Sequence, residues 1–243
     1  PRFGARARHF NFMEADDINY YRVPTPFTEL YFKTVPEQGQ QLDALVAVNT
    51  SDRVNISLAY KGVRALGKYV HMLTSTGNFR GTITYKTEDG KYDAKAHFVS
   101  QDLMNQENGG LDSLAIEQYR SKEEDFEDRT LLEMNYTNAR STLYGKRFFL
   151  DHSYQLTAPA PDRRGLTAGH VLNYNYKKFD FQQATAVNEI YGASFGASNL
   201  RDVVRLDEFY NEGFIQYSGA GLGILKAKAA VTSIDYGYNS LYF

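Results

Sequence analysis

The side chains best suited to catalysis or metal binding are five histidines, in a chain of 243 residues that has no cysteine. They are His9, His71, His97, His152 and His170. None belongs to an HExxH motif or to a closely spaced pair, so the spacing predicts no metal site. Ser153 follows His152, but the G-x-S-x-G turn of a hydrolase nucleophile is missing. We therefore expect no catalytic residues, no metal and no cofactor, and we do not expect an enzyme.

Three further motifs could bind ligands but have simpler explanations. The acidic run at 123–128 lacks the glycine and the alternating ligands of a calcium loop, which indicates a solvated surface loop. The "GAGLG" stretch at 219–223 lacks dinucleotide-loop spacing and a βαβ context, so we expect a turn. Arg2, Arg6 and Arg8 alternate along the chain, which would suit a pore wall better than an isolated phosphate site.

The composition favours strands that are joined by tight turns. The chain has 19 Tyr, 16 Phe, 19 Gly and only 6 Pro. A net charge of −2 gives no reason to expect nucleic acid as a partner. Mean hydropathy is −0.50, and no stretch approaches the roughly 18 apolar residues of a spanning helix. A helical membrane protein is thereby excluded, whereas a membrane β-barrel is not, because half of each strand there is polar.

The domain organisation is simple, because no change in composition and no repeat divides the chain. We expect a single β-barrel domain over 1–243. The chain begins at Pro1 without an apolar signal core, which indicates a trimmed or partial chain. Such a chain could be one segment of a larger barrel.

A hairpin is predicted at 78–98, where apolar and polar residues alternate on both sides of Asp89-Gly90. A two-residue turn there sets Ile83 opposite Ala96 on one face and Lys86 opposite Asp93 on the other. A second hairpin with a three-residue loop at 50–52 sets Val46 opposite Ile56. In both predicted registers the apolar faces coincide.

Further strands bring the expected total to about ten. They are predicted at 27–35, 41–49, 53–61, 131–136, 146–156, 170–179, 208–218 and 224–238. The short turns at 50–52 and 89–90 fall at one end of the sheet. Longer stretches at 62–77 and after Gln101 fall at the other end.

Alternation alone does not say which face meets water, because a soluble barrel and a membrane barrel share the same period. Three observations favour a membrane barrel. Aromatic residues lie near both ends of the apolar rows, small residues such as Ala94 interrupt these rows, and long loops gather at one end. On this interpretation the lipid-facing residues are Val54, Ile56, Leu58, Tyr60, Phe79, Ile83, Tyr85, Tyr92 and Phe98. The pore-lining residues are Arg80, Thr82, Thr84, Lys86, Asp93, Lys95, His97, Asn55, Ser57 and Lys61.

Several stretches resemble a known family. The pieces "EQGQQLDA", "VNTSDRVNISLAYKG", "STGNFR", "QENGG" and "GKRFFLDHSYQL" are similar to the putative porin family of Bacteroidota-type outer membranes. The resemblance is strongest over 27–156 and looser beyond. It implies an antiparallel transmembrane β-barrel with short turns on one side and long loops on the other, in the bacterial outer membrane. It also favours lipid contact for the apolar rows, and it implies that these residues are part of a longer barrel.

Two functions from different classes follow. The first is a porin that allows selective diffusion of small polar solutes or ions through a charged lumen. The second is a plugged structural barrel within a larger outer-membrane assembly, with the acidic run as a partner surface. The expected partners are outer-membrane lipid and, for the second function, other outer-membrane protein subunits or lipoproteins. A soluble β-barrel carrier is a third alternative, and it would be stable in water without detergent.

Overall fold

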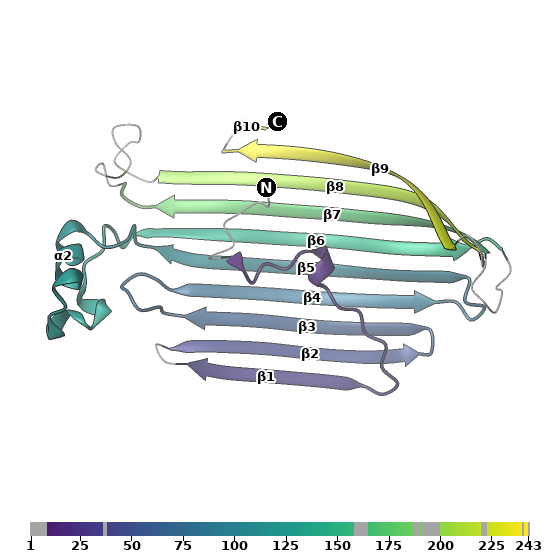
Figure 1. Ribbon diagram of the computed structural model, residues 1–243, viewed down its shortest axis with the longest axis horizontal. Coiled ribbons are helices and arrows are strands. Elements are labelled where there is room, and N and C mark those ends of the chain that lie inside the picture. Colours follow the sequence, from purple (N-terminus) through teal and green to yellow (C-terminus); the bar gives the residue numbers. More distant parts are fainter. Residues whose placement is uncertain are drawn as a thin grey trace.

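The computed structural model describes residues 9–35, 38–157, 165–186, 190, 200–219, 223–239 and 241–242. Its main feature is one antiparallel sheet in which each strand pairs with its neighbours in the sequence (Figure 1). The strands are β1 (Phe27–Val35), β2 (Gly39–Ser51), β3 (Val54–Ala65), β4 (Thr74–Lys86), β5 (Tyr92–Glu107), β6 (Ala139–Gln155), β7 (Gly165–Gln183), β8 (Leu200–Gly219), β9 (Gly223–Tyr238) and β10 (Leu241–Tyr242). The all-β antiparallel prediction is confirmed.

The sheet is open over the described residues. There, β1 pairs only with β2, and β10 pairs only with the end of β9. The side chains of β1 are exposed along its whole length, and those of β9 are exposed at all but one position. The wall of the predicted barrel is therefore present as a sheet with two free edges.

The register predicted for the β4–β5 hairpin is confirmed. Ile83 pairs with Ala96, and Lys86 pairs with Asp93. The turn itself is longer than predicted, because the last hydrogen bond that joins the two strands runs from the Thr87 nitrogen to the Tyr92 carbonyl at 3.0 Å. Gly90 adopts a positive φ of 68° between them, which glycine tolerates without steric cost.

The register predicted for the β2–β3 hairpin is wrong by two residues. Val46 pairs with Leu58 rather than with Ile56, and the pairing is irregular between Asn49 and Ser51. A bulge there absorbs one residue, and a tight turn at Asp52 and Arg53 replaces the three-residue loop. A shift of two residues leaves every side chain on its predicted face, because side chains alternate with period two.

The strand predicted at 131–136 is also wrong. This stretch contributes only the end of η3 (Arg129–Leu131) and one isolated bridge between Met134 and Leu111. It belongs to a long β5–β6 connection that also holds α2 (Ser113–Ser121) and η2 (Glu124–Phe126). The Asp112 carboxylate caps α2 by accepting a hydrogen bond from the Ala115 nitrogen at 2.7 Å.

The connections differ between the two ends of the sheet. The β3–β4 and β5–β6 connections lie at the end that carries α2, and the turns after β2 and β4 lie at the opposite end (Figure 1). The predicted asymmetry is confirmed for these four connections. Within the described residues, no helix combines the length and the apolar character needed to cross a membrane.

The two faces of the sheet differ in character. One, here called the apolar face, presents exposed side chains such as Leu58 and Ile83, which are 54% and 43% exposed. The other, here called the polar face, carries buried polar residues that include Asn55, Asn78, His97, Gln101 and Arg147. Small and aliphatic side chains, among them Ala59, Val99 and Leu143, are buried between these polar groups.

Candidate functional site

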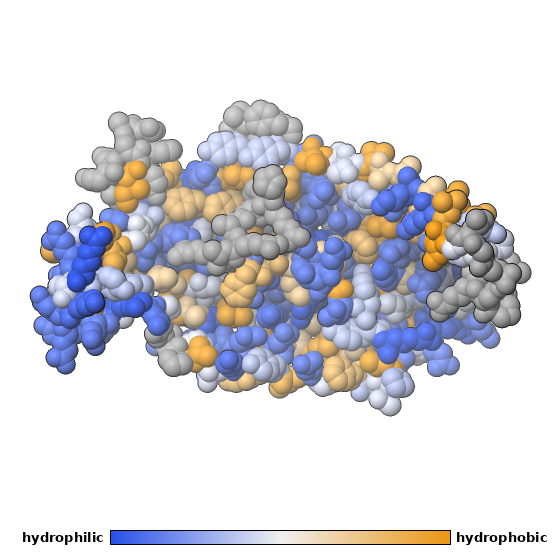
Figure 2. All heavy atoms as spheres, viewed as in Figure 1, coloured by the Kyte–Doolittle hydropathy of each residue, from blue (hydrophilic) through white to orange (hydrophobic). Residues whose placement is uncertain are grey.

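The polar face is crossed by residues 9–26, here called the N-terminal segment. In Figure 1 this segment (purple) passes in front of the middle strands and then descends to the start of β1. It includes a short 3-10 helix, η1 (Ala15–Asp17), and the Glu14 nitrogen just before it donates to the Asp17 carboxylate at 2.8 Å. Figure 2 views the same face, on which hydrophilic residues are spread widely with apolar residues scattered among them.

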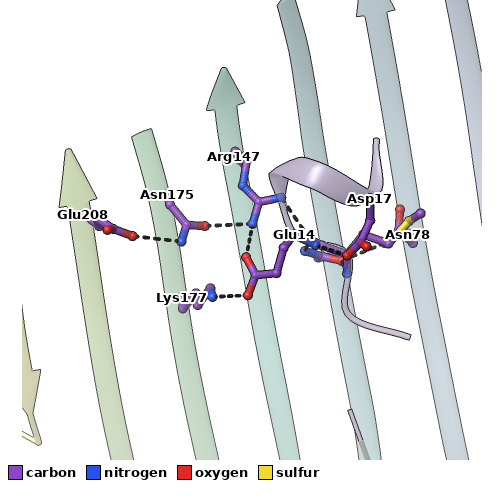
Figure 3. A network of polar contacts seen from close by, with 9 residues as sticks. Glu14, Asp17, Asn78, Arg147, Asn175, Lys177 and Glu208 are labelled. Carbon is purple, nitrogen blue, oxygen red and sulfur yellow. Dashed lines mark hydrogen bonds and ion pairs between the residues drawn. The ribbon is translucent and has the colours of Figure 1, made fainter. Parts of the chain in front are cut away.

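Glu14 anchors the N-terminal segment to two strands at once. One carboxylate oxygen accepts from Arg147 Nη2 at 2.7 Å, and the other accepts from Lys177 Nζ at 2.6 Å. Arg147 Nη2 also lies 3.3 Å from Asn175 Oδ1 (Figure 3). The Arg147 side chain is only 2% exposed. Its guanidinium would be a buried, poorly compensated charge without Glu14, and such groups strongly destabilise a fold.

The backbone of the same segment is held by a neighbouring amide. The Met13 nitrogen donates to Gln101 Oε1 at 3.0 Å, and Gln101 Nε2 donates back to the Met13 carbonyl at 3.0 Å. Asn78 Nδ2 donates to the same Gln101 oxygen at 2.7 Å, and Arg147 Nη1 donates to the same Met13 carbonyl at 2.9 Å. The segment thus forms backbone hydrogen bonds with the sheet as well as ion pairs, which fixes its position along the strands.

A second attachment lies nearer the short turns. The Tyr20 hydroxyl forms a 2.7 Å hydrogen bond with His97 Nδ1, and the His97 ring stacks on Phe149 with centroids 4.9 Å apart. The Lys95 ammonium lies 5.5 Å from the centroid of the Tyr20 ring. Partial burial, together with the nearby Asp151 carboxylate, raises the pKa of Tyr20 above its usual range. The hydroxyl therefore keeps its proton and can donate to His97.

Gly145 leaves room for the Phe12 ring against β6. A Cβ atom added at Gly145 would lie 2.6 Å from the Phe12 ring and 3.0 Å from Gln101 Cγ. We predict that Gly145→Ala displaces Phe12 and weakens the docking of the N-terminal segment by about 1–3 kcal/mol, the usual cost of overpacking. Limited proteolysis of the folded protein would measure this as faster cleavage within residues 9–26.

Gly81→Ala is the matched control for this substitution. A Cβ atom there meets only Leu58 Cδ2, at an ordinary contact distance of 3.5 Å on the apolar face. Equal cleavage rates for wild type, Gly81→Ala and Gly145→Ala would contradict the assigned role of Gly145.

The predicted pore-lining residues all lie on the polar face, and the predicted lipid-facing residues all lie on the apolar face. The polar row is not uniformly open. Asn55, Ser57, Thr82 and His97 are buried, and the Ser57 and Thr82 hydroxyls are hydrogen-bonded at 2.5 Å. Toward the short turns, other members of the row line a cavity of about 220 Å³ under residues 20–22 of the N-terminal segment. Its charged lining residues are Arg22, Asp52, Arg53, Lys86, Asp93 and Lys95.

Sequence reasoning missed the central contacts of this site. Glu14, Gln101, Arg147 and Lys177 were not singled out, although the parity of β5, β6 and β7 places the last three on the polar face. One signal was available, because Glu14 belongs to an acidic cluster "MEADD" that precedes a chain whose polar rows are rich in basic residues. What alternation could not give is the path of a segment that lies outside the sheet.

Two other sequence predictions have different outcomes. The acidic run at 123–128 lies in the β5–β6 connection, where all its residues except Phe126 are exposed. The Asp128 carboxylate accepts two hydrogen bonds from Thr130, which lower the pKa of Asp128. Arg2, Arg6 and Arg8 lie outside the described residues.

Comparison with known protein families identifies the family of this chain. The family model described as "Putative porin" covers residues 1–243 of the chain. No curated protein and no solved structure was found to match. The family resemblance noted from the sequence is therefore confirmed, and it extends over the whole chain. In general terms this is a porin-like outer-membrane protein, and the chain belongs to the putative porin family.

Proposed function

We propose that the chain forms the wall of a bacterial outer-membrane channel through which small polar solutes or ions diffuse. The main support for this proposal is the separation of the two faces of the sheet. One face has charged and amide side chains, and the other has exposed apolar side chains. A lipid-facing wall requires the apolar face outside, and an aqueous lumen requires the polar face inside. A porin family also suggests a non-enzymatic channel rather than an enzyme.

On this proposal the N-terminal segment lies inside the lumen and narrows it. The Glu14 ion pairs and the Met13 hydrogen bonds hold the segment against β5, β6 and β7. Solutes would then pass beside the segment rather than through the full cross-section of the lumen. Selectivity would come from fixed charges near this constriction, because ions respond to the local field of a narrow pathway.

The proposal is tested by single-channel recording of the purified full chain in planar lipid bilayers. We expect discrete conductance steps from a folded, detergent-stable protein. A stable barrel that produces no steps would contradict the diffusion channel.

The charges on the polar face give a more specific prediction. Lys86 and Lys95 line the cavity beneath Tyr20, and Lys95 also pairs with Asp151 at 3.3 Å. Changing both lysines to glutamate reverses the local field and is expected to shift the zero-current potential in a salt gradient toward cation selectivity. Lys91→Glu is the control, because Lys91 lies in the turn and does not line this cavity. An unchanged potential in the double variant would argue against ion passage along this face.

The second candidate function is a plugged structural barrel within an outer-membrane assembly. The observation that favours it is the burial of Arg147 beneath the N-terminal segment, since a tightly held segment can close a lumen. Subunits or lipoproteins of the outer membrane would be its partners, and the exposed acidic run would be the contact surface. A stoichiometric partner that remains bound after mild detergent extraction would support this function. A conducting, monodisperse single species would exclude it.

A further inference from the structure

Two histidines that are distant in the sequence face each other on the sheet. His152 of β6 and His170 of β7 are direct partners in the antiparallel register. His152 Nε2 lies 3.3 Å from His170 Nδ1, and the ring centroids are 5.4 Å apart. Both side chains are half-buried, on the same face as Ala94 and toward the short turns. Polar side chains on a lipid-facing surface are energetically costly, and residues of this kind commonly mark functional sites.

The outer nitrogen of each ring is held by a further polar group. The Tyr92 hydroxyl lies 3.2 Å from His152 Nδ1, and His170 Nε2 lies 3.1 Å from Asn211 Oδ1. The four side chains thus form one polar line across β5, β6, β7 and β8. Ring orientation in metal-binding histidines is set in this way, through a hydrogen bond on the nitrogen that does not bind the metal.

The separation of the two inner nitrogens matches the geometry of one metal ion. Two Zn²⁺–nitrogen bonds of about 2.0–2.1 Å that meet at a tetrahedral angle place their nitrogens about 3.3–3.4 Å apart. His152 Nε2 and His170 Nδ1 are 3.3 Å apart. We propose that His152 and His170 form a two-histidine site for a divalent transition-metal ion, with Zn²⁺ as the ion that the geometry fits.

The proton balance of binding is straightforward. Without metal, one set of proton positions satisfies all three hydrogen bonds. Tyr92 donates to His152 Nδ1, His152 Nε2 donates to His170 Nδ1, and His170 Nε2 donates to Asn211 Oδ1. A metal needs free lone pairs on both inner nitrogens. His170 already offers one, and His152 provides the other when its proton moves from Nε2 to Nδ1. The Tyr92 hydroxyl then rotates and accepts this proton in a hydrogen bond, so no net proton is released.

The remaining coordination positions face outward from the sheet. Gly213 is opposite His170 on β8, and an added Cβ there would have nothing within 4 Å, so the space beside the pair is open. Within the described residues, no group of three or more His, Cys, Asp or Glu side chains is placed to hold a metal. The site is therefore a two-ligand site that water or a carboxylate from another molecule completes.

Isothermal titration of the purified full chain with Zn²⁺ alone tests the proposal. We expect one site per chain in the wild type, and loss of that site in both His152→Ala and His170→Ala. Asn211→Ala should weaken binding by about 10-fold or more, because it removes only the orienting hydrogen bond. His71→Ala is the control and should bind as the wild type does, since His71 bonds the Ala139 carbonyl in a different region.

Electron paramagnetic resonance with Cu²⁺ provides a second measurement that does not depend on heat signals. Coupling of the ion to two imidazole nitrogens is expected in the wild type, and this two-nitrogen signal should be absent in each single histidine variant. Circular dichroism of every variant establishes that the sheet is intact. Absence of a Zn²⁺ site in the folded wild type, or a site that survives in the double histidine variant, would overturn the proposal.

Discussion

Replacing Glu14 with lysine is expected to release the N-terminal segment from the polar face. The new ammonium would lie against Arg147 and Lys177, where the carboxylate now accepts contacts of 2.7 and 2.6 Å. Two charge-assisted hydrogen bonds are lost and a like-charge cluster is created, so docking should weaken by about 3 kcal/mol or more. Single-channel recording should show a larger conductance, and limited proteolysis should cleave the freed segment.

Asp16→Lys is the matched control for this prediction. It makes the same charge change two residues away, at an exposed position. Its conductance and cleavage rate should remain close to those of the wild type. If both variants behave alike, the effect comes from the total charge of the segment and the specific role of Glu14 is wrong.

Replacing Ile83 with lysine is expected to prevent stable insertion into a bilayer. Ile83 lies on the apolar face of β4 and is 43% exposed. A lysine on the lipid face costs about 2–4 kcal/mol near the bilayer midplane. Folding into lipid vesicles, followed by urea titration, should give a lower midpoint or no folded fraction.

Thr84→Lys separates the effect of face from the effect of charge. Thr84 follows Ile83 in β4, so it lies on the opposite, polar face, where it lines the cavity under Tyr20. On the proposed orientation its lysine would reach water, so folding in vesicles should be retained. Loss of folding in Thr84→Lys with normal folding of Ile83→Lys would reverse the assignment of the two faces.

Much of the sheet could be predicted because strand period and turn chemistry are local properties. The β4–β5 register followed from one Asp-Gly pair and from matching apolar rows. The β2–β3 register was off by two because a bulge near Thr50 shifts the pairing without changing the faces, and alternation is blind to a shift of that size. The stretch at 131–136 has strand-like composition, but it lies in a connection outside the ladder.

The candidate site was less accessible to sequence reasoning. A face assignment can be obtained from parity, and the ten proposed pore-lining residues do share one face. The docking of the N-terminal segment on that face could not be predicted, because Glu14 contacts Arg147 and Lys177, which are 133 and 163 residues away in the sequence. The histidine pair was missed for a related reason. His152 and His170 are 18 residues apart, and only the β6–β7 register makes them neighbours.

The contacts of the N-terminal segment also have a consequence for the order of assembly. Every strand of the sheet can pair with the strand made just before it, so the wall can grow one hairpin at a time. Met13 and Glu14 must instead wait for Gln101, Arg147 and Lys177, which follow them by 88, 133 and 163 residues. Met13 and Glu14 precede every strand of the sheet in the sequence, yet their contacts can form only after β7 is in place. A docked segment would mark a wall that has been completed at least as far as β7.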